Sequence, residues 1–149
     1  MRILAFTGSL VGMVAFISHT TVDCTDAYAL STWWKVTLGY TDLDDDPNGL
    51  GDEECMIRDP KTGHLLLFVE TPDAAEAKQR SGKNRIHFDL RPATSSQEQE
   101  VEALVARGAS VVGDLRGKYG PGTGWVVLAD PEGNEFCVLR SEAERAATV

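Results

Sequence analysis

The chain has 149 residues, with 14 lysines and arginines against 23 aspartates and glutamates and a formal net charge of -9. This length fits one domain, or two small repeats around a shared core, and neither a disulfide nor a metal is needed for stability. The 42% hydrophobic and 25% charged fractions are typical of a globular protein. The negative charge repels phosphate backbones and excludes general nucleic-acid binding.

The cysteines form no Cys-x-x-Cys pair and leave an odd thiol: Cys24, Cys55 and Cys137. This pattern favours a reducing compartment over a disulfide framework. Residues 1–17 are apolar but too short for a membrane span, and no small-residue cleavage site follows them. We therefore expect a cytoplasmic protein without membrane contact, in which residues 1–12 are an extension and Met13 begins the domain.

The first half of the chain predicts a strand, a helix and two further strands. Residues 14–24 are rich in β-branched side chains and predict the first strand. Thr25 or Asp26 can cap the helix, which ends at Gly39. Its apolar stripe follows helical spacing: Ala27, Leu30, Trp34 and Leu38. The further strands come after an acidic loop that can include a weak strand: residues 55–57 and 65–69.

The second half predicts the same order of elements after a polar connector with one helical turn at Pro72. A strand at residues 85–90 leads to a helix that ends at Gly108. The candidate caps of this helix are Thr94, Ser95 and Ser96, and its buried stripe is Val101, Leu104 and Val105. The remaining strands are predicted at residues 109–112, 125–128 and 135–139.

The two halves match each other. His19 in the first strand corresponds to His87, the turn at Asp59 corresponds to that at Asp130, and Leu67 then falls opposite Cys137. Each pair lies about 70 residues apart, and recurrence at a nearly constant spacing indicates a duplicated unit. The repeated unit consists of a strand, a helix and three further strands.

The residues that carry a family resemblance span about 14–140: the first strand with His19, the helix end at Trp34–Tyr40, the strand with His87, and the turn Asp-Pro-Glu-Gly-Asn at 130–134 before the final strand. The chain resembles the vicinal oxygen chelate superfamily, and within it the glyoxalase-like and bleomycin-resistance-like proteins. The resemblance implies an α+β fold of two βαβββ modules, whose curved mixed sheet encloses a cleft. A fold of this kind hosts many reactions and fixes none.

Strand alternation predicts which side chains face the cleft. His87 and Asp89 share the polar face of their strand, and Ile86, Phe88 and Leu90 share the face that covers the core. By the repeat, His19 and Thr21 occupy the polar face in the first module, so we expect His19 and His87 to face one shared space. Trp125 follows a glycine-rich loop, and we weigh ligand stacking against core packing for it.

The resemblance also implies a metal ligand set, with a histidine from each of the two matching strands and a carboxylate from the final strand of each module. The corresponding final-strand residues here are Leu67 and Cys137, so the set is incomplete. We therefore expect no metal cofactor; His19 and His87 are the candidate ligands if a divalent ion is bound. A calcium-loop pattern at Asp44 lacks its final glutamate and predicts only a solvated acidic loop.

From these patterns we predict one domain at residues 13–142, with module one at 13–71, a connector at 72–83, module two at 84–142 and a tail at 143–149. The favoured function is binding of a small organic molecule in the cleft, by a homodimer. A metal-dependent lyase, isomerase or dioxygenase is the alternative, and a purely structural or regulatory dimer is the third. The predicted ligand-binding residues are His19, Thr21, Leu67, His87, Asp89, Trp125 and Cys137.

Overall fold

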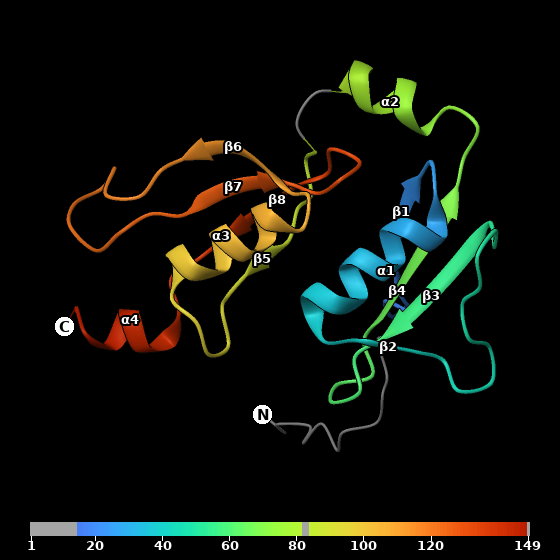
Figure 1. Ribbon diagram of the computed structural model, residues 1–149, viewed down its shortest axis with the longest axis horizontal. Coiled ribbons are helices and arrows are strands. Elements are labelled where there is room, and N and C mark those ends of the chain that lie inside the picture. The colour runs from blue at the N-terminus through green and yellow to red at the C-terminus, as the bar shows by residue number, and fades with distance from the viewer. Residues whose placement is uncertain (1–14, 82–83, 149) are drawn as a thin grey trace, which may run out of the picture.

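The computed structural model describes residues 15–81 and 84–148, and the proposed extension at 1–12 and Met13 lie outside them. The first module contains β1 (Thr20–Cys24), α1 (Ala27–Leu38), β2 (Thr41–Asp42), β3 (Glu54–Arg58) and β4 (Leu65–Glu70). A connecting helix, α2 (Ala74–Ser81), leads to the second module. That module contains β5 (Asp89–Leu90), α3 (Gln97–Ala106), β6 (Ser110–Asp114), β7 (Val126–Ala129) and β8 (Glu135–Val138), and α4 (Glu142–Ala146) follows it (Figure 1).

Each module forms a four-stranded mixed sheet with the same topology. The strand orders are β1-β4-β3-β2 and β5-β8-β7-β6. In both sheets the first strand pairs parallel with the last, and the remaining pairs are antiparallel. The predicted α+β fold of two βαβββ modules is therefore confirmed.

The helix ends follow from local chemistry. The Asp26 side chain accepts a hydrogen bond from the Ala29 N–H at 2.8 Å, and Gly39 ends α1 with a φ of 68° that favours glycine. Ser96 begins α3 in a capping box with Gln99. The predicted stripe of α3 is correct for Val101 and Leu104 but wrong for Val105, which is 41% exposed.

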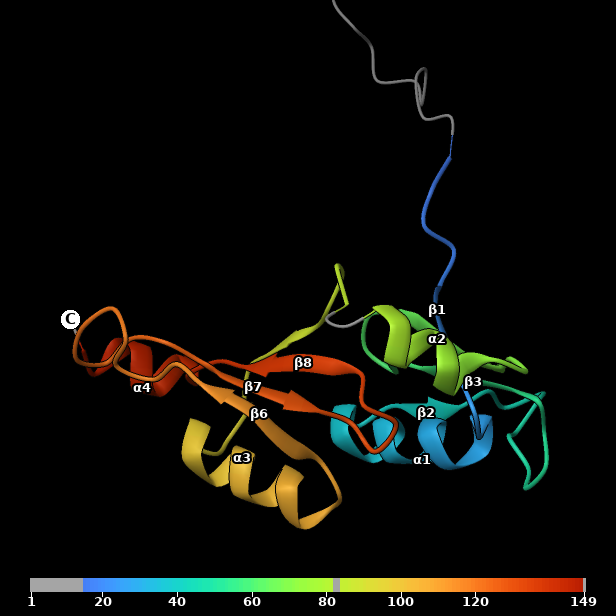
Figure 2. The ribbon, with the colours of Figure 1, turned by 90° about the horizontal axis from the view of Figure 1, so that it is seen from above.

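One hydrophobic core joins the two modules. In Figure 2, α1 and α3 cover the same side of the two sheets, and α2 lies on the opposite side. Trp33 and Trp34 of α1 contact Phe136 of β8 with ring centroids 6.0 and 5.1 Å apart. Trp34 also meets Phe88 edge-on at 5.6 Å. Both tryptophans are buried, although the helical stripe assigned only Trp34 to the core.

Three predicted elements differ from the structure. The first strand begins at Thr20 rather than at residue 14, and the strand predicted at 85–90 covers only Asp89–Leu90. Ile86 is 87% exposed, because it precedes the strand and no sheet face receives it. The connector holds a helix of 8 residues instead of one turn. The alanines and long charged side chains of this segment are good helix formers, but its polarity led to the prediction of a connector with one helical turn.

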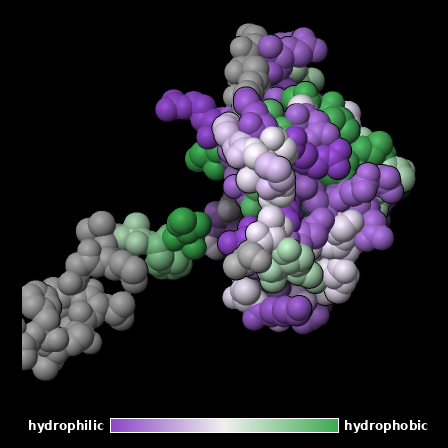
Figure 3. Space-filling model, turned by 90° about the vertical axis from the view of Figure 1, so that its left-hand side faces the viewer, coloured by the Kyte–Doolittle hydropathy of each residue, from purple (hydrophilic) through white to green (hydrophobic). Residues whose placement is uncertain are grey.

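Among the described residues, no helix combines the length and apolarity that a membrane crossing needs. The end of module two that carries α4 is covered mostly by polar side chains and side chains of intermediate hydropathy (Figure 3).

Candidate functional site

A groove lies where β1, α2 and the segment before β5 meet. Its volume is about 620 Å³. The polar side chains that line it include Thr21, Asp23, Asp73, Lys78, Asn84 and His87. The apolar ones are Val22, Trp34, Ala74, Ala77, Ile86 and Phe88. Both modules therefore contribute to one mixed polar and apolar surface.

A buried carboxylate supports the inner end of the groove. Asp130, which is 3% exposed, accepts a hydrogen bond from the Trp34 indole N–H at 2.9 Å. It also accepts from the Asn134 backbone N–H at 2.9 Å and from the Asn134 side chain. These bonds satisfy the carboxylate and hold Trp34, so Asp130 positions the groove wall.

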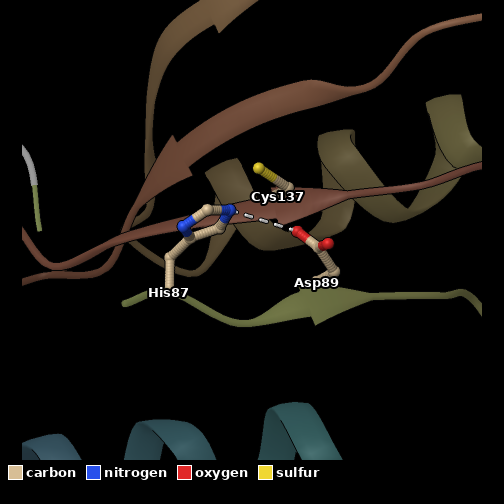
Figure 4. A group of neighbouring side chains, drawn as sticks. All are labelled: His87, Asp89 and Cys137. Atoms are coloured by element: carbon tan, nitrogen blue, oxygen red, sulfur yellow. Dashed lines mark ion pairs between the residues drawn. The ribbon is translucent and has the colours of Figure 1, made fainter. Parts of the chain in front are cut away.

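A second feature lies beside the groove in module two. Asp89 and Cys137 are partners in the parallel β5–β8 ladder, and His87 lies two residues before Asp89. The His87 Nε2 and an Asp89 carboxylate oxygen are 3.4 Å apart. Donor atoms of the three side chains all lie within 4.8 Å of one another. Figure 4 shows the imidazole, the carboxylate and the thiol pointing toward one another.

The predicted site residues thus fall into two groups. His87, Asp89 and Cys137 come together, and Thr21 lines the same groove as His87. Leu67 is the ladder partner of Thr21, as Cys137 is of Asp89, so the internal repeat predicted their equivalence correctly. His19, Leu67 and Trp125 are not among the described residues that line the groove. His19 lies just before β1, where its Nδ1 is 3.1 Å from the Ser18 hydroxyl oxygen.

Trp125 lies at the start of β7, and its ring stacks on Tyr119 at a centroid distance of 5.9 Å. Tyr119 belongs to the glycine-rich loop and is 63% exposed. This stack joins the loop to the residue just before β7, and Trp125 is not among the described residues that line the groove. Of the two roles weighed for Trp125, the stack favours packing.

The other two cysteines lie in the core of module one. Cys24 and Cys55 are both fully buried on the side of the sheet that faces α1. Burial raises the pKa of the Cys24 thiol to about 12, and nearby carboxylates, Glu132 first, add to the shift. Burial also raises the pKa of Cys55. Both thiols therefore stay protonated at neutral pH, and neither is suited to nucleophilic attack or metal ligation.

The hard-ion ligand set implied by the resemblance does not fit these residues. Leu67 offers no donor atom, and a thiol replaces the carboxylate at Cys137. Hard ions such as Mg²⁺ and Mn²⁺ prefer oxygen donors, whereas thiolates select softer metals. Asp89 supplies a carboxylate, but from the first strand of the module instead of the last.

Several groove residues had no signal in the sequence. Lys78 and Asp73 lie on or beside α2, in a segment whose sequence predicts only a polar connector, and the helical stripe predicts a core position for Trp34. The groove exists because α2 folds back over β1, a contact that no local pattern encodes.

The sequence matches the family model of the glyoxalase-like domain over residues 19–139. The chain belongs to this family. A comparison with curated protein sequences finds no match. The match covers both modules and the groove between them.

Solved structures agree with this glyoxalase-like fold. A FosX fosfomycin resistance protein from Listeria monocytogenes, in a complex with Mn(II) and 1S,2S-dihydroxypropylphosphonic acid, has a TM-score of 0.61 at 13% identity and covers 91% of this chain and 99% of its own. FosX from Mesorhizobium loti has a TM-score of 0.57 at 12% identity, with coverages of 91% and 99%. A glyoxalase/bleomycin resistance protein/dioxygenase family enzyme from Burkholderia phytofirmans PsJN has a TM-score of 0.52 at 21% identity, with coverages of 81% and 94%. At these identities the likeness shows the fold alone.

Proposed function

We propose that this chain binds a small organic molecule in the groove between its modules. The groove itself carries the proposal, because its volume of about 620 Å³ falls within the range of about 300–1,000 Å³ that is typical of small-molecule sites. Such sites combine apolar walls with a few polar groups that orient the ligand. The groove has this composition.

The lining indicates the chemistry of the ligand. Trp34, Phe88 and Ile86 offer apolar and aromatic surface, and Ile86 is exposed where it lines the groove. Asp23, Asp73 and His87 offer hydrogen-bonding and charged groups along the same surface. An amphipathic molecule with hydrogen-bonding nitrogen or oxygen atoms fits both halves of the lining.

The names of some solved relatives support a resistance-type role. The FosX structures are named as fosfomycin resistance proteins, and one contains Mn(II). Leu67 and Cys137 remove the carboxylates that a hard ion requires here. We therefore propose ligand binding that uses no hard divalent ion.

A thermal-shift screen against a library of amphipathic metabolites and antibiotics tests the proposal. A ligand present at 100 times its Kd stabilises the folded state by about 2.7 kcal/mol, which is easily detected. Ala77→Trp would fill the groove from α2 and should abolish the shift. Ala106→Trp, on the exposed end of α3, is the matched control and should retain it. Shifts that survive Ala77→Trp would place the ligand elsewhere and refute the proposal.

A reaction in the same groove is the second candidate, favoured by the three converging side chains beside it. His87 both lines the groove and belongs to that cluster. Incubation of each bound compound with the protein, followed by mass spectrometry, separates the two candidates. Unchanged compounds support binding alone, and turnover that His87→Gln abolishes supports the enzyme.

We also propose a homodimer as the assembly. On the open face of the first sheet, Met56, Leu67 and Val69 are neighbours in register and remain half-exposed. A second copy would cover this apolar face. Light scattering after size exclusion tests the assembly, and a monomer at micromolar concentration would refute it.

A further inference from the structure

We propose that the groove selects a cationic ligand, in which a positively charged nitrogen group is joined to an aromatic or apolar body. This inference rests on the proposed binding function and deepens it, because it assigns the charge of the molecule that the groove takes. The argument depends on two carboxylates, that of Asp23 on β1 and that of Asp73 just before α2. The fold brings both to one surface, because α2 lies over β1 (Figure 2).

Neither carboxylate is neutralised within the part of the chain that the structure describes. The Asp23 and Asp73 side chains are exposed, and no hydrogen bond or ion pair of a described residue reaches them. Other acids near the groove have clear partners. Asp130 accepts a hydrogen bond from Trp34, and Glu132 accepts one from the N–H at the start of α1. The Asp23 and Asp73 carboxylates are therefore open to a ligand.

The charge of the groove lining is negative. The described lining residues include one lysine, Lys78, and no arginine, against four acids: Asp23, Asp73, Asp130 and Glu135. The Lys78 ammonium donates a hydrogen bond to the Asn84 side-chain oxygen at 3.0 Å and so joins α2 to the segment before β5. Because Lys78 forms no ion pair with Asp23 or Asp73, it leaves their charges uncompensated. The net charge of -9 on the whole chain also attracts cations and repels anions.

The apolar part of the lining indicates that the cation belongs to a larger organic molecule. Ile86 is 87% exposed and Phe88 is half-buried, and both line the groove together with the two carboxylates. An ion pair with an exposed carboxylate is weak by itself, so apolar contact has to supply most of the affinity. Cations also bind favourably over aromatic faces. A flat aromatic body with a positive nitrogen group uses both parts of the lining at once.

Three tricyclic probes of similar shape and different charge test the assignment: the cation 9-aminoacridine, neutral acridine and the anion acridine-9-carboxylate. Equilibrium dialysis measures their affinities for the full-length chain at about 0.01 M salt, where the Debye length is about 30 Å, and at about 1 M, where it is about 3 Å. At low salt we expect the cation to bind at least about fivefold more tightly than acridine, as two exposed ion pairs allow. The anion should bind most weakly, and the preference should shrink to about twofold or less at high salt.

A pair of double variants shows whether these two carboxylates cause the preference. Asp23→Asn/Asp73→Asn should lose it, because asparagine keeps the shape of the side chain and removes the charge. Asp45→Asn/Asp46→Asn removes the same net charge from the loop between β2 and β3 and is the matched control, which should keep the preference. All four side chains are exposed, so both variants should fold. Neutral acridine should bind the unchanged chain and both variants alike.

Equal affinity for 9-aminoacridine and acridine would overturn the assignment, as would no binding of 9-aminoacridine or an equal loss of cation affinity in the two double variants. Ala77→Trp, which fills the groove from α2, separates these results from a failure of the groove function. If the probes bind without a charge preference and Ala77→Trp weakens them all, the groove binds ligands but does not select cations. If Ala77→Trp leaves every affinity unchanged, the probes bind elsewhere and both proposals fail.

Discussion

Glu132 joins the two modules through a single carboxylate, and its replacement by glutamine tests that connection. One carboxylate oxygen accepts hydrogen bonds from the Thr25 hydroxyl and the Asp26 N–H, both at 2.9 Å. The other accepts from the Thr25 N–H at 2.8 Å. Asp26 is the N-cap of α1, so a side chain from the β7–β8 turn of module two binds the start of the helix of module one.

The expected loss can be worked from these contacts. Glu132→Gln keeps one acceptor oxygen but places an amide donor against the Thr25 N–H. One charge-assisted hydrogen bond, worth about 1.5–3 kcal/mol, is lost. The favourable interaction of the charge with the helix N-terminus, about 0.3–1 kcal/mol, is lost as well. Since the remaining oxygen can partly compensate, we expect the free energy of unfolding to fall by about 2 kcal/mol and Tm by about 4–8 °C.

Urea unfolding followed by tryptophan fluorescence measures this loss, because Trp33 and Trp34 lie at the junction of the modules. Glu102→Gln, on the exposed side of α3, is the control and should change the free energy by no more than about 0.5 kcal/mol. A Glu132→Gln loss no larger than that of the control would refute the argument that this carboxylate stabilises the junction.

Three further predictions follow from other contacts. Residues 13–72 expressed alone should remain unfolded or aggregate by circular dichroism and size exclusion, because Trp33 and Trp34 lose Phe88 and Phe136; a sharp thermal transition of the monomeric fragment would contradict shared folding. Trp125→Ala should lower Tm through loss of the Tyr119 stack and leave the affinity for any groove ligand unchanged. Weaker ligand binding at an equal folded fraction would show that Trp125 belongs to the binding site. Hydrogen bonds from the Ser141 and Gln97 backbone N–H groups hold the pKa of Glu144 below its ordinary 4.5. The contribution of the Glu144 carboxylate to the free energy of unfolding is therefore present above pH 4.5 and is lost as the pH falls through the lowered pKa. The difference in free energy of unfolding between the unchanged chain and Glu144→Gln should shrink in acid. A difference that stays constant with pH would exclude this cause.

Local signals determined much of the fold. Asp26 and Gly39 mark the ends of α1, and the Ser96–Gln99 pair marks the start of α3, because caps act within one turn of the helix. The recurrence of His19 at His87 and of Leu67 at Cys137 predicted the duplicated topology, since equal order and spacing of elements produce equal sheets. Strand alternation predicted that His87 and Asp89 lie together, and their side chains do lie close, although His87 precedes β5.

The candidate site depended on contacts that no local pattern contains. β5 covers only Asp89–Leu90, and Ile86, which lies before it, is exposed at the groove and not in the core. The groove forms because α2 packs over β1, and Lys78 and Asp73 become part of it only through that packing. The sequence by itself determined that His87, Asp89 and Cys137 are available on matching strands. Only the tertiary structure decided that their donor atoms lie within 4.8 Å of one another, in a described group that does not include His19.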